Sequence, residues 1–187
     1  MLGSASEINR SFSECSLNTN ISTISGGLVG QLLGTIQDSY SNCRIGPDFG
    51  GFKGGLIGQP ASLPTFFPKP KILRSYAIGP ISCISFLSFE CGGLVGIANS
   101  NAELEIINSY WNMETTGMTH SVGSTAPTNF AETIGGTGLT STQMRNSTNF
   151  LNWDFNTIWK IEPDSFRSKV IGSRTKIRVT TFRRTKN

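Results

Sequence analysis

A glycine-bounded apolar pentapeptide that occurs three times is the feature that most constrains the fold of this chain. The copies read Gly-Gly-Leu-Val-Gly, Gly-Gly-Leu-Ile-Gly and Gly-Gly-Leu-Val-Gly, and they begin at residues 26, 54 and 92. Repeats at such spacing are typical of solenoids, in which each unit buries its apolar side only against its neighbours. The defining positions of these glycine boxes are Gly26, Gly27, Leu28, Gly30, Gly54, Gly55, Leu56, Gly58, Gly92, Gly93, Leu94 and Gly96.

A second signature follows each box: an isoleucine two or three residues before a serine and an aromatic residue. It runs from Ile36 to Tyr40, from Ile72 to Tyr76 and from Ile107 to Tyr110, and a copy without a preceding box runs from Ile8 to Phe12. Because two motifs recur in the same order, the chain is predicted to repeat one structural unit. The serines that recur in phase are Ser11, Ser39, Ser75 and Ser109.

These motifs predict short strands separated by tight corners. Gly-Gly permits positive φ at a corner, where a side chain would clash with the neighbouring coil. The two apolar residues that follow form a very short strand with one side chain inward and one outward. Stacked coils would align the box leucines into an aliphatic ladder and the signature tyrosines into an aromatic ladder. The ladder tyrosines are Tyr40, Tyr76 and Tyr110.

Composition agrees with an all-β fold. The 187 residues include 21 glycines, and 15% of the residues are charged. No long stretch has apolar residues at i, i+3, i+4 and i+7, as an amphipathic helix would. We therefore expect an all-β protein, a β-solenoid of about three to four stacked coils of short strands, closed by a Trp-rich C-terminal segment.

The formal net charge of +4 is unevenly distributed. Residues 1–166 carry eight basic and twelve acidic side chains, whereas residues 167–187 carry eight basic side chains and no acidic one. Residues 167–187 are therefore predicted to be a basic, disordered tail. Such a tail could bind nucleic acid or an anionic membrane surface nonspecifically, and no specific nucleic-acid binding is expected.

Three regions are predicted along the chain. Residues 1–111 hold the repeats, interrupted at 59–70 by a loop whose four prolines cannot occupy a central strand. Residues 112–166 form the closing segment, in which Phe150, Trp153, Phe155 and Trp159 make an aromatic cluster. No apolar run long enough for a transmembrane segment occurs, and the first residues lack the pattern of a secretory signal. Since the chain begins within a repeat, we expect a fragment of something longer.

The four cysteines suggest disulfides. Cys15 and Cys43 each lie three residues after the signature aromatic residue, so stacked coils would place them about 4.8 Å apart. A Cys15–Cys43 disulfide is thus geometrically feasible, and Cys83–Cys91 could close a short loop. Buried thiols that act as small apolar groups are the alternative. A zinc cluster is not expected, because no C-x-x-C pair is present.

Few residues could support catalysis. His120 is the single histidine, so the His-Glu-x-x-His of a zinc peptidase is absent, and no G-x-S-x-G elbow accompanies it. A polysaccharide-cleaving groove would need converging carboxylates, but neighbouring like charges on a rim are usually just solvated. We therefore predict no enzyme, no catalytic residue, no metal and no cofactor. The carboxylates weighed for such a groove are Glu103, Glu105, Glu114, Asp38 and Asp48.

The glycine boxes, spaced by Ile-x-x-Ser-Tyr-Ser, resemble the GLUG-motif repeats of bacterial and protist surface proteins. Those repeats occur in large adhesins and in IgA-specific metallopeptidases of the M26 type. The resemblance continues through Ser109 to Gly117, Gly138 to Met144 and Phe150 to Ile161, which look like the segment that follows the last repeat. It departs from the family after Ile161, where the basic tail begins, and at the proline-rich insertion.

This resemblance implies an extracellular or cell-surface location and a non-catalytic role as stalk or binding surface of an adhesin-like protein. The partner expected is a protein or glycan on a host or neighbouring cell. Tyr40, Tyr76 and Tyr110 are the candidate ligand surface, since a row of aromatic rings suits sugar stacking. The alternatives are the non-catalytic region of an M26-type IgA peptidase and a carbohydrate-binding or carbohydrate-active solenoid.

Overall fold

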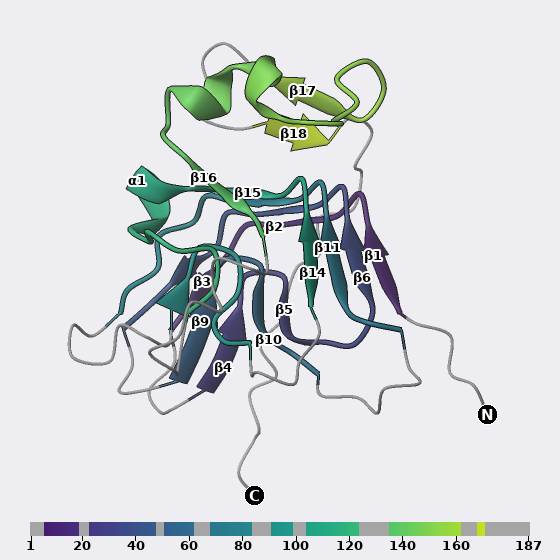
Figure 1. Ribbon diagram of the computed structural model, residues 1–187. Helices are drawn as coiled ribbons and strands as arrows, with labels where there is room; N and C mark the ends of the chain where they lie inside the picture. Colours follow the sequence, from purple (N-terminus) through teal and green to yellow (C-terminus); the bar gives the residue numbers. More distant parts are fainter. Residues whose placement is uncertain are drawn as a thin grey trace, which may run out of the picture.

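The computed structural model describes residues 6–18, 23–47, 51–61, 68–83, 91–98, 104–123, 135–161 and 168–170. Within these ranges the chain is all-β, built from short strands with one α-helix of four residues and two 3-10 turns (Figure 1). In chain order the elements are β1 (Glu7–Asn9), β2 (Phe12–Ser13), β3 (Ser16–Leu17), β4 (Thr23–Gly26), β5 (Val29–Leu32), β6 (Thr35–Gln37), β7 (Tyr40–Ser41), β8 (Arg44–Ile45), β9 (Gly51–Gly54), β10 (Ile57–Pro60), β11 (Lys71–Leu73), β12 (Tyr76–Ala77), β13 (Cys91–Gly92), β14 (Glu105–Ile107), β15 (Tyr110–Asn112), α1 (Met113–Thr116), β16 (Thr137–Leu139), η2 (Gln143–Arg145), η3 (Ser147–Asn149), β17 (Trp159–Ile161) and β18 (Ser168–Val170).

Strands from successive passes of the chain pair in parallel, a pass being the run of chain from one copy of the repeat to the next. β1, β6, β11 and β14 form one parallel sheet, here the isoleucine sheet, and lie side by side in Figure 1. β2, β7, β12, β15 and β16 form a second, the aromatic sheet. β4, β9 and β13 form a third, while β5 pairs with β10 and β3 with β8.

The core lies between these sheets and is built from equivalent residues of successive passes. Ile8, Ile36, Ile72 and Ile106 are in register across the isoleucine sheet. Ile36 and Ile72 are completely buried, and burial of such a side chain stabilises the fold by about 1.5–3 kcal/mol. The same core contains the box leucines of the second and third copies, which are also completely buried.

The register corrects one detail of the expected repeat. Ile106, not Ile107, continues the isoleucine series, because it pairs with Ile72. Ile107 points outward and is 45% exposed, as the alternation of side chains along a strand requires. Each signature isoleucine therefore stands three residues before its serine, at one fixed spacing.

Pairing between passes extends beyond residue 111. Val122 bridges Val95 in parallel, and β16 adds to β15, so the segment after residue 111 contributes a further pass. The proline-rich insertion changes the offset between partners, which is 28 residues for Ser11 and Ser39 and 36 for Ser39 and Ser75. Residues 62–67 of that insertion lie outside the described residues.

The C-terminal segment covers the aromatic sheet. Residues 141–161 carry η2, η3 and β17, and Figure 1 shows them above β2, β15 and β16. This segment is called the cover below. β17 pairs with β18 as an antiparallel hairpin. β18 lies within the segment predicted to be a disordered tail, so Ser168–Val170 differs from that prediction, and residues 171–187 lie outside the described residues.

Candidate functional site

The Ser-aromatic signature forms the corner between the isoleucine sheet and the aromatic sheet. The residue before each serine has positive φ, a conformation that is uncommon for residues other than glycine and that surrounding contacts must hold in place. The sequence gives no sign of this corner conformation, since two of its four positions are arginines. These residues are Arg10 at 48°, Asp38 at 48°, Arg74 at 41° and Asn108 at 48°.

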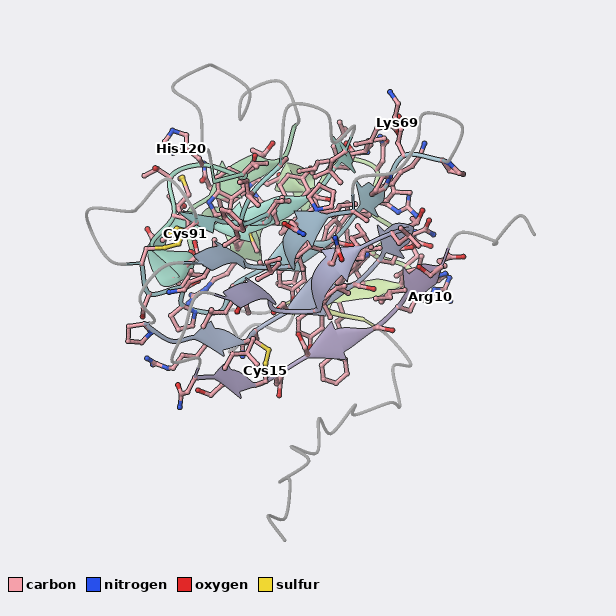
Figure 2. The ribbon with its side chains drawn as sticks, turned by 90° about the horizontal axis from the view of Figure 1, so that it is seen from below. Arg10, Cys15, Lys69, Cys91 and His120 are labelled. Carbon is pink, nitrogen blue, oxygen red and sulfur yellow. A yellow bond between two sulfur atoms is a disulfide. The ribbon has the colours of Figure 1, made fainter. Side chains whose placement is uncertain are left out.

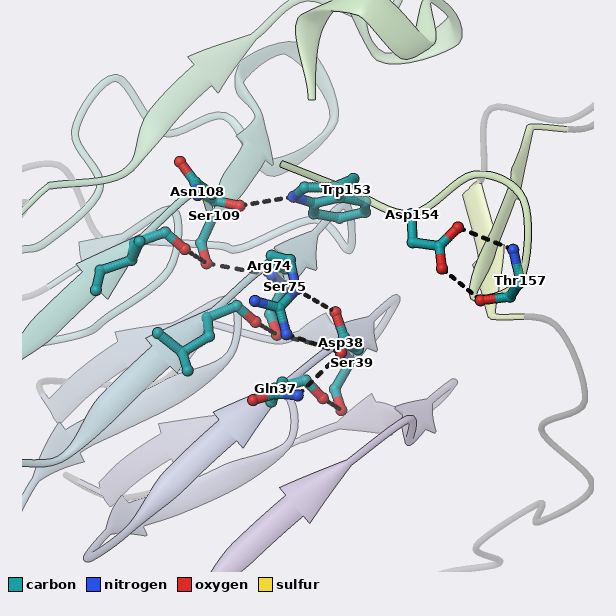
Figure 3. Close-up of polar contacts among 12 residues, drawn as sticks. Gln37, Asp38, Ser39, Arg74, Ser75, Asn108, Ser109, Trp153, Asp154 and Thr157 are labelled. Carbon is teal, nitrogen blue, oxygen red and sulfur yellow. Dashed lines mark hydrogen bonds and ion pairs between the residues drawn. The ribbon is translucent and has the colours of Figure 1, made fainter. Parts of the chain in front are cut away.

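Each signature serine stabilises its own corner and joins it to the next pass. The hydroxyl of Ser39 donates to the carbonyl of Gln37 at 2.7 Å, and that of Ser75 donates to Leu73 at 2.8 Å. The hydroxyl oxygen also accepts the backbone N–H of the serine one pass earlier, as in Ser39 to Ser75 at 3.1 Å. The same contacts join Ser11 to Ser39 and Ser75 to Ser109. The serines form a continuous hydrogen-bonded ladder, of which Figure 3 shows Ser39, Ser75 and Ser109.

The corner residues add an ion pair between passes. Arg74 Nε and Asp38 Oδ1 are 2.8 Å apart, and the second nitrogen donates to Asp38 Oδ2 at 3.1 Å. Gln37 donates to the same carboxylate. The hydrogen bonds that Arg74 donates to Asp38 raise the pKa of Arg74 above its ordinary value. Asp38 is almost fully buried, so its carboxylate is a structural partner of arginine rather than a group open to substrate.

The signature aromatic residues stack in a ladder. Phe12 lies 5.2 Å from Tyr40 with an interplanar angle of 8°, and Tyr40 lies 5.0 Å from Tyr76 at 6°. The cover packs on this ladder: the Trp153 ring lies 6.0 Å from Tyr76 and 5.7 Å from Tyr110. The Trp153 indole donates to the carbonyl of Asn108 at 2.7 Å (Figure 3).

This packing corrects the expectation that Tyr40, Tyr76 and Tyr110 form a ligand surface. Their exposed fractions are 3%, 0% and 5%, because the cover lies over them. The Tyr110 hydroxyl accepts the backbone N–H of Leu151, and burial raises the pKa of Tyr110. A sugar could stack on these rings only if the cover were displaced.

The glycine boxes are required for close approach rather than for positive φ. The described glycines with positive φ lie outside the boxes: Gly51, Gly117, Gly135 and Gly136. The expectation that Gly-Gly is needed at the box corners for positive φ is therefore wrong. A Cβ on Gly55 would overlap the carbonyl oxygen of Gly93 and lie 2.5 Å from the Ala77 side chain. The boxes therefore bring the backbones of two passes together where no side chain fits.

His120 belongs to a further, divergent copy of the box. The carbonyl of His120 accepts the N–H of Gly93, and that of Ser121 accepts the N–H groups of Leu94 and Val95. Sequence reasoning missed this copy because only Val122 and the glycine after it keep the pattern. The His120 ring is exposed, contacts the Thr119 hydroxyl at 2.9 Å and projects from the periphery in Figure 2.

The carboxylates weighed for catalysis have separate partners. Glu105 pairs with Lys71 at 2.7 Å. Glu114 accepts the N–H of Ser141, and hydrogen bonds from that serine lower the pKa of Glu114. Glu103 and Asp48 lie outside the described residues. Within the described ranges, no three His, Cys, Asp or Glu side chains gather as metal ligands would.

All four cysteines are paired. Cys15 bonds Cys43 across two successive passes, with their Cα atoms 4.4 Å apart. Cys83 bonds Cys91, eight residues further along the chain, with their Cα atoms 6.6 Å apart. Both separations lie in the ordinary range for a disulfide. The first bond ties two passes together covalently at equivalent repeat positions.

One solved structure has a similar fold. A putative immunoglobulin A1 protease from Bacteroides ovatus matches this chain with a TM-score of 0.53 and 16% sequence identity. The match covers 88% of this chain and 57% of that protein, so the chain spans a little over half of its length. At this identity the likeness shows a shared fold alone. No family model and no curated protein matches the sequence.

The described part of the chain holds no helix with the length and hydrophobicity needed to cross a bilayer.

Proposed function

We propose that this chain is a β-solenoid module that acts as a non-catalytic stalk or binding surface in a secreted or cell-surface adhesin-like protein. One observation carries the proposal: the recurring residues contact one another from pass to pass. The serines bond to the next corner, the glycines admit the next backbone, and the aromatic rings stack. A repeat whose recurring positions serve stacking fits a structural unit better than a catalytic one. The resemblance to GLUG-motif repeats supports the same role.

The disulfides support an extracytoplasmic location for this module. Together the two bonds use all four cysteines, and the Cys15–Cys43 bond joins two passes. Disulfides of this structural kind persist in oxidising compartments and are rare in the cytosol. A protein or glycan on a host or neighbouring cell is the partner we propose for such a module.

Labelling of intact cells tests this location. The source cells, carrying an epitope tag on the natural protein, are treated with a membrane-impermeant biotin reagent, with a cytosolic protein as control. We expect biotin on the tagged protein without lysis. The surface proposal would be refuted if the tagged protein, like the cytosolic control, were labelled only after the cells are lysed.

The fold of the Bacteroides ovatus protein favours a second candidate, the non-catalytic repeat region of an IgA-peptidase-like enzyme. In this case the catalytic groups lie in a different part of the parent protein. Incubation of immunoglobulin A1 with the natural full-length protein and with this chain alone separates the two candidates. If the full-length protein cleaves immunoglobulin A1 and this chain alone does not, the second candidate is selected. If neither protein cleaves it, the first candidate is selected. Cleavage by this chain alone would overturn both.

A further inference from the structure

Three Asn-x-Ser/Thr tripeptides occur in the chain, and each has the acceptor motif for an N-linked oligosaccharide. They begin at Asn9, Asn20 and Asn146. The tripeptide at Asn20 lies outside the described residues. Because so short a motif also arises by chance, the structure around the other two asparagines decides whether an enzyme can use them.

The tripeptide at Asn146 lies on the surface of the cover. Asn146, Ser147 and Thr148 are all exposed. The Asn146 Oδ1 accepts the backbone N–H of Thr148 at 3.1 Å and the Thr148 hydroxyl at 2.9 Å. Since both bonds end on the oxygen, the amide nitrogen of Asn146 lies on the other side of the carboxamide group. The two groups that define an acceptor site are therefore held side by side in an exposed turn.

The backbone hydrogen bonds of this tripeptide are local. The N–H of Asn146 donates to the carbonyl of Gln143, and the carbonyl of Asn146 accepts the N–H of Asn149. The carbonyl of Ser147 accepts the N–H of Phe150. Within the described chain, these partners all lie a few residues away in the cover. An enzyme can therefore bind the tripeptide without opening the solenoid.

The tripeptide at Asn9 is tied into the repeat instead. Asn9 ends β1, and Arg10 occupies the first corner with a φ of 48°. The N–H groups of Arg10 and Ser11 donate to Gln37 and Ser39 of the next pass. The Ser11 hydroxyl donates to the carbonyl of Asn9. An enzyme would have to break these bonds to take this tripeptide from the folded chain.

We propose that Asn146 is an N-glycosylation site of the folded chain and that Asn9 is protected by the fold. The donor is an oligosaccharide joined through a diphosphate to a lipid, and an oligosaccharyltransferase catalyses the transfer. The amide nitrogen of Asn146 forms a bond to C1 of the first sugar, and the bond from C1 to the diphosphate oxygen breaks. The lipid diphosphate leaves, and the amide proton passes to a base of the enzyme.

The biological use of this site rests on the secretion proposed above, because such transfer takes place on the extracytoplasmic side of a membrane. Purified components test the site without regard to location, so failure at Asn146 and failure of the surface proposal are distinguishable. The folded, oxidised full chain is incubated with an oligosaccharyltransferase and a lipid diphosphate-linked oligosaccharide. Mass spectrometry of the glycopeptides then measures the occupancy of each asparagine.

The variants test the two parts of the motif. Asn146→Gln removes the amide nitrogen that reacts, and Thr148→Ala removes the hydroxyl. Ser147→Ala is the matched control, since it changes an exposed residue of the same turn and keeps the motif. Synthetic peptides of residues 6–14 and 143–151 show whether the enzyme accepts each motif outside the fold.

We expect the enzyme to modify both peptides. In the folded chain, the occupancy of Asn146 should exceed that of Asn9 by about tenfold or more, because hydrogen bonds to the next pass hold the Asn9 tripeptide. Asn146→Gln and Thr148→Ala should abolish modification at this position, whereas Ser147→Ala should retain it. Near-UV circular dichroism confirms that each variant folds.

Three results would overturn the proposal. The first is a folded chain that stays unmodified at Asn146 although the 143–151 peptide is modified. The second is equal occupancy of Asn9 and Asn146 in the folded chain. The third is a 6–14 peptide that the enzyme does not accept, because the sequence and not the fold would then exclude Asn9.

Discussion

Removal of a single hydroxyl from the serine ladder is expected to weaken the stack by a predictable amount. In Ser75→Ala, the N–H of Ser39 loses its acceptor, which lies 3.1 Å away. Both serines are completely buried, so water cannot replace that acceptor. The carbonyl of Leu73 loses the Ser75 hydroxyl but keeps the N–H of Asp38 at 3.1 Å. The substitution thus leaves one buried donor unpaired, which costs about 1–3 kcal/mol.

Ser11→Ala is the matched control for this substitution. The Ser11 hydroxyl lies at the start of the ladder and donates to the carbonyl of Asn9 in an exposed bond. Its loss is expected to cost about 0.5 kcal/mol or less, as for an ordinary surface change. Urea unfolding measures both free energies. Thermal unfolding should show a lower midpoint for Ser75→Ala by about 2–4 °C per kcal/mol. Equal losses in the two variants would refute the ladder as a source of stability.

Further outcomes follow from the boxes, the cover and the titration of one carboxylate. Gly55→Ala should prevent folding, because its Cβ overlaps the next box, whereas Gly30→Ala, with 3.3 Å to its nearest neighbour, should fold; circular dichroism checks both. Trp153→Ala should cost about 3–5 kcal/mol and increase binding of a hydrophobic dye as the tyrosine ladder becomes exposed. Hydrogen bonds from Thr157 and Asn156 lower the pKa of Asp154 in the folded chain, so its contribution is present above about pH 4 and is lost as pH falls through the folded value. Tryptophan fluorescence should report this loosening of the cover, and Asp154→Asn should reduce its pH dependence.

Much of the fold could be predicted because the residues that recur in the repeat have clear physical preferences. The order of glycine box, isoleucine, serine and aromatic residue predicts which strands become neighbours. The aromatic ladder follows from the recurrence of Phe12, Tyr40 and Tyr76 at one phase. Stacking of equivalent positions also brings Cys15 beside Cys43.

Other features depend on contacts that no local pattern shows. The positive φ of Arg10 and Arg74 is set by the corner and not by the preference of arginine. The further pass near Val122 keeps too few box residues to be recognised. The burial of the tyrosines cannot be predicted locally, because the cover follows them in sequence by many residues and sequence alone does not place it over the ladder.

Disulfide mapping of the native, oxidised protein tests the central claim, that successive copies of the repeat stack in register, most directly. Stacking places the Cα atoms of Cys15 and Cys43 4.4 Å apart. Peptide mass spectrometry without reduction should therefore recover a Cys15–Cys43 peptide pair and a Cys83–Cys91 pair. A bond from Cys15 to Cys83 or to Cys91 would contradict the stacked arrangement.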